Sequence, residues 1–190
     1  MTLTNEEYHA DPAISASHLK AVMQSPYHYW SRYLNPKRPI MEPTAAMRLG
    51  SLAHCAVLEP DELHNRYAIA PDRRSNAGKA LAADMAARGL EAVTEADMAL
   101  AYAMADAVRQ HPYAAALLAD GKAEQSFWAD DTATGLRVKA RPDWYFGGTI
   151  VDLKTCQDAS PSGFARACAT FNYHTQASHY LNVTFAERFV

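Results

Sequence analysis

Hydrophobic and polar residues alternate most regularly between residues 136 and 154 of the chain. Successive side chains of a β-strand point to opposite faces, so this alternation predicts two strands. The apolar face would hold Leu136, Val138 and Ala140 on the first strand and Val151 and Leu153 on the second. Gly147 and Gly148 lie between them, and a glycine pair suits a tight turn. The pattern therefore predicts a β-hairpin.

The opposite face of this hairpin is charged. Its members are Arg137, Lys139, Arg141 and Asp143 on the first strand, and Asp152 and Lys154 on the second. Matched faces would bring Asp143, Asp152 and Lys154 together. Two carboxylates can hold Mg²⁺, and a neighbouring ammonium can orient water and offset charge at a phosphate. A solvated strand face would explain any one of these residues, but the set of three favours a metal-dependent nuclease site.

Helix-start signals and helical periodicity organise the N-terminal region. Ser15 suits the N-cap of a helix over residues 16–24, and Ser25 followed by Pro26 suits the start of a second helix reaching residue 34. The second helix has an aromatic face that we expect to pack into the core. That face contains Tyr27, Trp30, Tyr33 and Leu34. Residues 1–43 would thus form a helical lead.

Two further helical regions follow. Residues 44–58 form an apolar helical stripe with Gly50 and His54 on the adjacent face, and a lone histidine in such a place is more often structural. The alanine-rich stretch 76–119 predicts a helical insertion, with a break at Arg88-Gly89 and a capped start at Thr94. We assign this insertion no chemistry.

The remaining elements are a strand and a helix. The strand covers residues 123–130 and would place Glu124, Ser126 and Trp128 on one face. The helix runs from about residue 163 to Phe185, with Phe164, Cys168 and Phe171 on its buried side. Gln176 and Tyr180 are four residues apart, so they would meet on the surface of this helix.

Composition narrows the class of protein. The 190 residues are 49% hydrophobic and 21% charged, as in an ordinary globular domain. The chain has no run long enough to span a membrane, its polar start is unlike a signal peptide, and its three cysteines do not make a disulfide framework. A reducing cytoplasm is therefore the expected location. The net charge of −3 disfavours tight nucleic-acid binding by the chain as a whole, so local positive charge would be needed.

The order of Pro142-Asp143 on one strand and Asp152-Leu153-Lys154 on the next resembles the signature of the PD-(D/E)XK nuclease superfamily. Further segments resemble the phage-type exodeoxyribonuclease VIII (RecE-like) family, in the same order, from about Tyr8 to Leu181. They are ISASHLKAVMQSPYHYW, RLGSLAHCAVLEP, EQSFW, RPDW, VDLKT and QASHYL. The resemblance implies an α/β fold with a restriction-endonuclease-like core, in which helices flank a mixed central sheet, and helical N-terminal additions. It also implies one nuclease domain over residues 1–190, whose last core strand would only begin at Phe189-Val190.

The resemblance extends the candidate site. The catalytic set becomes Asp143, Asp152, Lys154, Gln176 and Tyr180, and the metal ligands become Asp143, Asp152, the Leu153 carbonyl, His54 and Glu124. Here His54 matches a Gly-x-x-x-His pattern beginning at Gly50. Arg137, Lys139 and Arg141 remain the expected DNA-binding residues.

The implied function is a Mg²⁺-dependent exonuclease that acts 5′→3′ on double-stranded DNA ends and supplies single strands for phage-type recombination. Mn²⁺ would substitute for Mg²⁺, and a single-strand annealing protein and further copies of the chain would be partners. An iron–sulfur cluster is not expected, because Ser25 stands where the iron–sulfur relatives have a cysteine and the other thiolates are missing. An endonuclease with the same core and a DNA-binding protein that does not cut remain alternatives.

Overall fold

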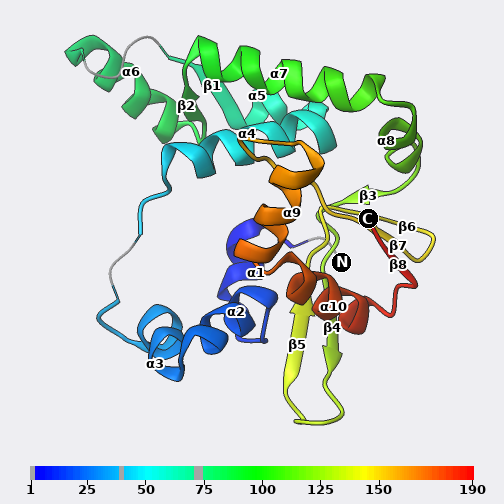
Figure 1. The fold of residues 1–190 in the computed structure, drawn as a ribbon. Helices are drawn as coiled ribbons and strands as arrows, with labels where there is room; N and C mark the ends of the chain where they lie inside the picture. Colours follow the sequence, from blue (N-terminus) through cyan, green and yellow to red (C-terminus); the bar gives the residue numbers. More distant parts are fainter. Residues whose placement is uncertain (1–2, 39–40, 71–74) are drawn as a thin grey trace. The chain divides into compact units, whose positions relative to one another are not determined.

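The computed structural model describes residues 3–38, 41–70 and 75–190 (Figure 1). Contacts divide the chain into two compact units, which we describe separately. The first unit contains Met1–Glu42 and Gly121–Val190, and the second contains Pro43–Asp120. The helical insertion expected over residues 76–119 lies within the second unit, and the single domain over residues 1–190 stays a prediction.

The first unit is built on a mixed sheet. Its strands lie in the order β3 (Lys122–Ala123), β6 (Trp144–Phe146), β7 (Thr149–Val151) and β8 (Arg188–Phe189). The first two pairings are antiparallel, and β7 pairs with β8 in parallel. The prediction of a mixed sheet is therefore confirmed, and β8 lies where the last core strand was expected to begin.

The predicted turn joins β6 to β7. Gly147 and Gly148 have φ of +47° and +77°, the left-handed region that glycine adopts without a steric penalty. The turn pairs Trp144 with Val151 and Phe146 with Thr149. The hairpin is therefore present, but shorter than the alternating pattern suggested.

The predicted first strand is broken in the middle. Residues 137–140 form a separate strand, β5 (Arg137–Ala140), which pairs antiparallel with β4 (Phe127–Asp130). The chain leaves β5 at residue 141, and Pro142 is almost fully buried there without an N–H to donate to a neighbouring strand. The strand predicted over residues 123–130 is broken too, because Glu124 adopts a left-handed φ of +52° between β3 and β4.

Five helices complete the described part of the first unit. They are α1 (Asn5–Ala10), α2 (Ala16–Gln24), α3 (Pro26–Tyr29), α9 (Pro161–Thr170) and α10 (Tyr173–Thr184), and a π-helical turn (Trp30–Leu34) continues α3. The predicted starts at Ser15 and Ser25 are confirmed, and the Ser25 hydroxyl accepts a hydrogen bond from the His28 N–H. The single helix predicted from residue 163 to Phe185 is wrong, because Asn172 takes a left-handed conformation and separates α9 from α10.

The burial predicted for two aromatic faces is also wrong. Tyr27 and Trp30 at α3 are 69% and 45% exposed, and Phe164 and Phe171 at α9 are exposed as well. The core of this unit lies elsewhere. In Figure 1, β4 and β5 form a long ribbon, and α10 packs on both strands. His179 of α10 is buried there, with its Nε2 2.9 Å from the Lys139 carbonyl oxygen.

The second unit is mostly helical. Its elements are α4 (Ala45–Leu58), η2 (Pro60–Glu62), α5 (Leu63–Arg66), β1 (Tyr67–Ile69), α6 (Asn76–Ala87), β2 (Glu91–Val93), α7 (Glu95–Gln110) and α8 (Pro112–Leu117). The predicted apolar stripe of α4 is buried at Leu52, Ala53 and Ala56, and α4 packs on α7. The parallel pair of β1 and β2 was not predicted. Among the described residues, no helix is both long and apolar enough to cross a bilayer.

Candidate active site

The two motif acids flank the hairpin of β6 and β7. Asp143 directly precedes β6 and Asp152 directly follows β7, next to the last paired residues, Trp144 and Val151. The Leu153 N–H donates a 2.7 Å hydrogen bond to Asp143 Oδ2, which fixes the first carboxylate against the second segment. On the other side, the Asp152 N–H donates a 2.9 Å hydrogen bond to the Val190 carbonyl. The hairpin therefore brings Asp143 next to the segment of Asp152 and Leu153, and the ion pair of Lys154 with Asp152 completes the group of Asp143, Asp152 and Lys154 that the sequence predicted.

Asp152 is the centre of the polar contacts. Its side chain is 3% exposed and forms an ion pair with Lys154. Gln176 of α10 donates a 3.0 Å hydrogen bond from Nε2 to Asp152 Oδ1. A nearly buried carboxylate needs such partners, because an unpaired charge in this position would be strongly destabilising.

The Asp143 carboxyl group has a raised pKa. Burial is the main cause, and the Lys154 charge, the Leu153 N–H and a hydrogen bond with Asp152 act in the opposite direction. Two adjoining carboxyl groups compete for ionisation, so a proton or a cation has to neutralise part of their charge. An all-oxygen pair of this kind suits a hard cation such as Mg²⁺.

Two residues missed by the sequence interpretation adjoin this cluster. Lys20 of α2 donates a 3.4 Å hydrogen bond from Nζ to Gln176 Oε1. The ammonium groups of Lys20 and Lys154 lie 5.7 Å and 5.3 Å from the centre of the Tyr173 ring. The sequence held one signal for Lys20, which is its place in residues 12–41, a stretch without Asp or Glu.

Tyr180 completes the group on α10. Its pKa is raised well above the ordinary value, mainly by burial and also by the charges of Asp152, Tyr8 and Asp143, while a hydrogen bond with Gln176 lowers it. The phenol therefore stays protonated near neutral pH and can donate a hydrogen bond. The structure thus brings together all five residues of the predicted catalytic set.

The other predicted metal ligands have separate positions. Glu124 is tied to the cluster through its backbone, because its N–H donates a 3.2 Å hydrogen bond to the Asp143 carbonyl. Its carboxylate lies 3.9 Å from Arg141 Nη1. His54 is half-buried on α4 in the second unit, so its role as a ligand stays a prediction. Within the described parts of the chain, no three or more His, Cys, Asp or Glu side chains gather in a group that could hold a metal ion.

The basic ladder predicted along β5 is bonded mainly to the protein itself. Arg137 is exposed and pairs with Asp130 at 3.1 Å. Lys139 is 2% exposed, and its ammonium donates to the carbonyl oxygens of Tyr8 and Asp11. DNA binding by these cations stays a prediction, and for Lys139 it would require the N-terminal segment to leave.

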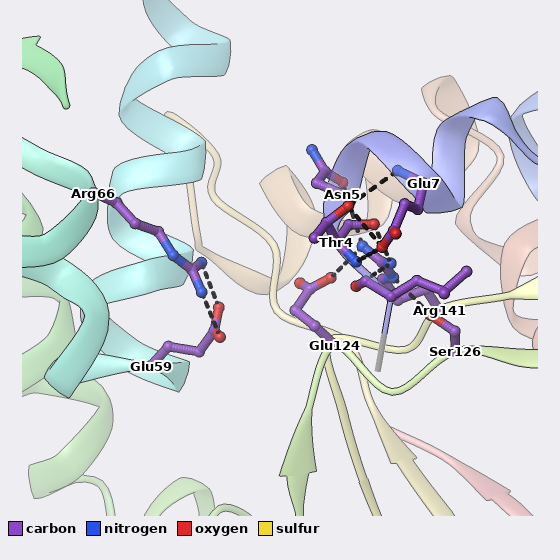
Figure 2. Close-up of polar contacts among 9 residues, drawn as sticks. Thr4, Asn5, Glu7, Glu59, Arg66, Glu124, Ser126 and Arg141 are labelled. Carbon is purple, nitrogen blue, oxygen red and sulfur yellow. Dashed lines mark hydrogen bonds and ion pairs between the residues drawn. The ribbon is translucent and has the colours of Figure 1, made fainter. Parts of the chain in front are cut away.

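Arg141 is held in the same way, and Figure 2 shows its contacts. Its guanidinium donates to the Ser126 hydroxyl at 3.1 Å and to the Leu3 and Thr4 carbonyls at 3.1 and 3.2 Å. It also lies 4.2 Å from the centre of the Tyr8 ring. Residues 3–11 are therefore anchored by two buried cations, and we call them the N-terminal anchor.

A cavity of about 940 Å³ opens beside the acid cluster within the first unit. Lys20, Gln176 and Tyr180 line it near the acids. The rest of its lining comes mainly from α1, α2, α3 and the π-helical turn, together with Glu124, Lys139 and Arg141. It thus offers a route from α3 to the side chains that contact Asp152.

Similarity to known proteins extends over most of the chain. The profile of a family described as "PDDEXK-like domain of unknown function (DUF3799)" matches residues 15–188. The crystal structure of a protein named "Putative exonuclease" from Eubacterium rectale is similar, with a TM-score of 0.61 and 20% sequence identity over 96% of this chain and 67% of that chain. At this identity the likeness concerns the fold. No curated protein matches the chain.

Proposed function

The chain belongs to the DUF3799 family of PDDEXK-like domains, and from this premise we propose that it is a metal-dependent deoxyribonuclease. Membership and the mixed sheet confirm the restriction-endonuclease-like fold expected from the sequence. The observation that carries the proposal is the cluster at the end of the hairpin. In it, Asp143 is bonded to the Leu153 N–H, and Asp152 is bonded to both Lys154 and Gln176.

The donor set fits a divalent cation. Asp143 and Asp152 would supply carboxylate oxygens and Leu153 its carbonyl oxygen, and Mg²⁺ commonly takes one or two carboxylates together with waters and substrate phosphates. When bound, the cation would neutralise the phosphate and lower the pKa of an attacking water. Glu124 and His54 are proposed as further ligands on the resemblance to PD-(D/E)XK nucleases alone.

The side chains around the acids would divide the remaining work. Lys154 would orient the attacking water and offset the negative charge that develops at phosphorus. Gln176 would hold Asp152 in place through its 3.0 Å hydrogen bond. Tyr180, kept protonated by its raised pKa, would donate a hydrogen bond to a phosphate oxygen or a water.

The finer proposal is a 5′→3′ exonuclease that acts on double-stranded DNA ends and provides single strands for phage-type recombination. Its supports are the sequence resemblance to the RecE-like family and the name of the similar E. rectale protein, "Putative exonuclease". A single-strand annealing protein, other copies of the chain and a cytoplasmic location belong to the same proposal.

The test compares two forms of one plasmid in Mg²⁺. A linearised plasmid should be degraded to nucleotides while the covalently closed form survives, and a label at the 5′ or 3′ end gives the polarity. Cutting of both forms would replace the exonuclease by an endonuclease. If neither form is cut while DNA is still bound, the protein is a DNA-binding protein and the proposed catalysis is wrong.

A further inference from the structure

In one stretch of this acidic chain, all Asp, Glu, Lys and Arg positions are occupied by Lys or Arg. Residues 12–41 contain no Asp or Glu, although the whole chain has a net charge of −3. The same stretch contains Lys20, Arg32, Lys37 and Arg38. The last three are exposed and lie at or just after the π-helical turn that continues α3. Positive charge that is available to a ligand is therefore concentrated here.

Two exposed aromatic rings lie beside these cations. Tyr27 and Trp30 stack on each other, with ring centres 5.9 Å apart and planes 29° from parallel. Their exposure of 69% and 45% leaves ring surface open to solvent. A stacked aromatic pair with neighbouring arginines is the arrangement on which unpaired bases stack while their phosphates meet positive charge.

The face continues into the cavity beside the acids. Tyr27, Arg32 and Arg38 line the same cavity as Lys20 and Gln176. Lys20 donates to Gln176, and Gln176 donates to Asp152. A DNA strand bound at Tyr27 could therefore extend along this cavity to the acid cluster.

Two cations of the predicted basic ladder, Lys139 and Arg141, are buried. Lys139 and Arg141 are 2% and 8% exposed and bonded to the N-terminal anchor, so they do not offer free charge to a phosphate backbone in this conformation. The Arg32 guanidinium lies 5.7 Å from the centre of the Tyr33 ring, and Arg38 donates a 2.8 Å hydrogen bond from Nη1 to the Tyr33 carbonyl. These contacts hold both guanidinium groups near α3.

We propose that Tyr27, Trp30, Arg32, Lys37 and Arg38, which we call the α3 face, bind single-stranded DNA. The proposal rests on the deoxyribonuclease function and adds a separate site for unpaired nucleotides next to the acid cluster. Single strands fit better than duplex, because base pairing and stacking hide the ring faces that Tyr27 and Trp30 would contact. Bases would stack on the two rings, and the arginines would neutralise adjacent phosphates.

The test measures binding without cleavage. Fluorescence anisotropy of a labelled dT20 oligonucleotide is followed in EDTA, where the metal-dependent reaction cannot proceed. The double variant Tyr27→Ala/Trp30→Ala should weaken dT20 binding by tenfold or more, as expected for lost base stacking. Arg32→Ala/Arg38→Ala should reduce the slope of log K against log salt by about 1.4, or roughly 0.7 for each phosphate contact.

Matched controls are available on the same chain. Tyr113→Ala removes a tyrosine that is 51% exposed on α8, and Arg166→Ala removes an exposed arginine from α9. Both should leave dT20 binding unchanged, and circular dichroism should show that all the variants fold. Binding of a blunt 20-base-pair duplex should be less affected by the aromatic substitutions than binding of dT20.

The outcomes separate this proposal from the nuclease proposal. If the parental protein binds dT20 and both α3-face variants bind it equally well, the proposal is overturned, whether or not the enzyme cuts DNA. The α3 face would then be a candidate site for a protein partner. Undetectable parental binding would overturn it as well. Loss of dT20 binding in a protein that never cuts DNA would uphold the α3 face and overturn the nuclease function alone.

Discussion

At the scale of single residues, the acid cluster depends on Asp152 and Lys154. Asp152→Asn would remove the proposed negative metal ligand and keep its shape, and Lys154→Ala would remove the charge that we propose to lie beside the attacking water. Each should lower the cleavage rate by about a thousandfold, or roughly 4 kcal/mol of transition-state stabilisation. Tyr180→Phe should be milder, since one hydroxyl contact contributes about 0.5–1.5 kcal/mol.

Single-turnover rates on linear DNA measure these effects, and thermal melting checks that each variant is folded. Lys122→Ala is the matched control, because it removes an exposed lysine from β3 of the same sheet. Near-parental cleavage by folded Lys154→Ala protein would rule out the proposed role of this lysine.

His179 gives the fold a pH dependence. Burial lowers its pKa, although the hydrogen bond to the Lys139 carbonyl acts in the other direction, and burial also lowers the pKa of His9 and His18. The histidines of the unfolded chain bind protons at a higher pH than those of the folded chain. The stability that the folded state gains from neutral, buried histidines is therefore complete above about pH 6.5 and is lost as the pH falls below it.

The difference in melting temperature between pH 7.5 and pH 5.5 tests this effect. It should be positive for the parent and smaller for His179→Gln, while His174→Gln, which changes an exposed histidine of α10, should leave it unchanged. An equal difference in the parent and His179→Gln would show that His179 does not contribute.

At the scale of elements, the N-terminal anchor supplies hydrogen-bond acceptors to Lys139 of β5 and to Arg141, which follows this strand. Deleting residues 1–11 would leave Lys139 and Arg141 without the carbonyl oxygens of Leu3, Thr4, Tyr8 and Asp11. The deletion also removes the Asp11 carboxylate, which lies 3.8 Å from Lys139 Nζ. Removing the partner of a buried charge commonly costs about 3–5 kcal/mol, and we expect a loss of that order in the free energy of unfolding. Urea denaturation measures it.

A second substitution makes this experiment specific. Lys139→Met in the shortened chain removes the uncompensated charge and should recover part of the lost stability. In the 190-residue chain the same substitution should not stabilise the fold, because the anchor already satisfies Lys139. Equal stability of the shortened chain and the 190-residue chain would show that water replaces the anchor at little cost.

Local signals predicted several element boundaries correctly, because capping chemistry depends on neighbours in sequence. Ser15, Ser25 and Thr94 all cap the helices expected of them. The breaks at Glu124 and Asn172 were missed, because alternation of polar and apolar residues carries no information on a left-handed φ. Hydrophobic pattern alone likewise could not show that Tyr27 and Trp30 would remain exposed.

At the scale of the whole molecule, motif spacing predicted the centre of the site better than its surroundings. Asp143, Asp152 and Lys154 meet because a two-residue glycine turn fixes which positions of β6 and β7 lie opposite each other. The burial of Lys139 and Arg141 depends instead on residues more than 120 positions away, and no local pattern encodes such a contact. The same holds for Lys20, which reaches Gln176 from α2.

Metal removal tests the activity of the molecule as a whole. Cleavage should require Mg²⁺ or Mn²⁺, and Ca²⁺ should support DNA binding more than cutting, because its looser geometry aligns water poorly. Release of acid-soluble nucleotides is measured after stripping with chelator and again after each cation is restored. Undiminished release in excess chelator would exclude the metal-dependent reaction.

The N-terminal anchor also bears on how the chain is made. Tyr8 and its partner Lys139 are 131 positions apart, so the anchor leaves the ribosome well before the strand that it covers. At about 5–20 residues per second, the interval is on the order of ten seconds. During that time the segment has only its own short helix to form, and β5 cannot bury its cations until the segment returns. A tag or chaperone that holds these first residues would therefore delay the burial of Lys139 and Arg141. This delay in folding would occur whether or not the tag affects catalysis.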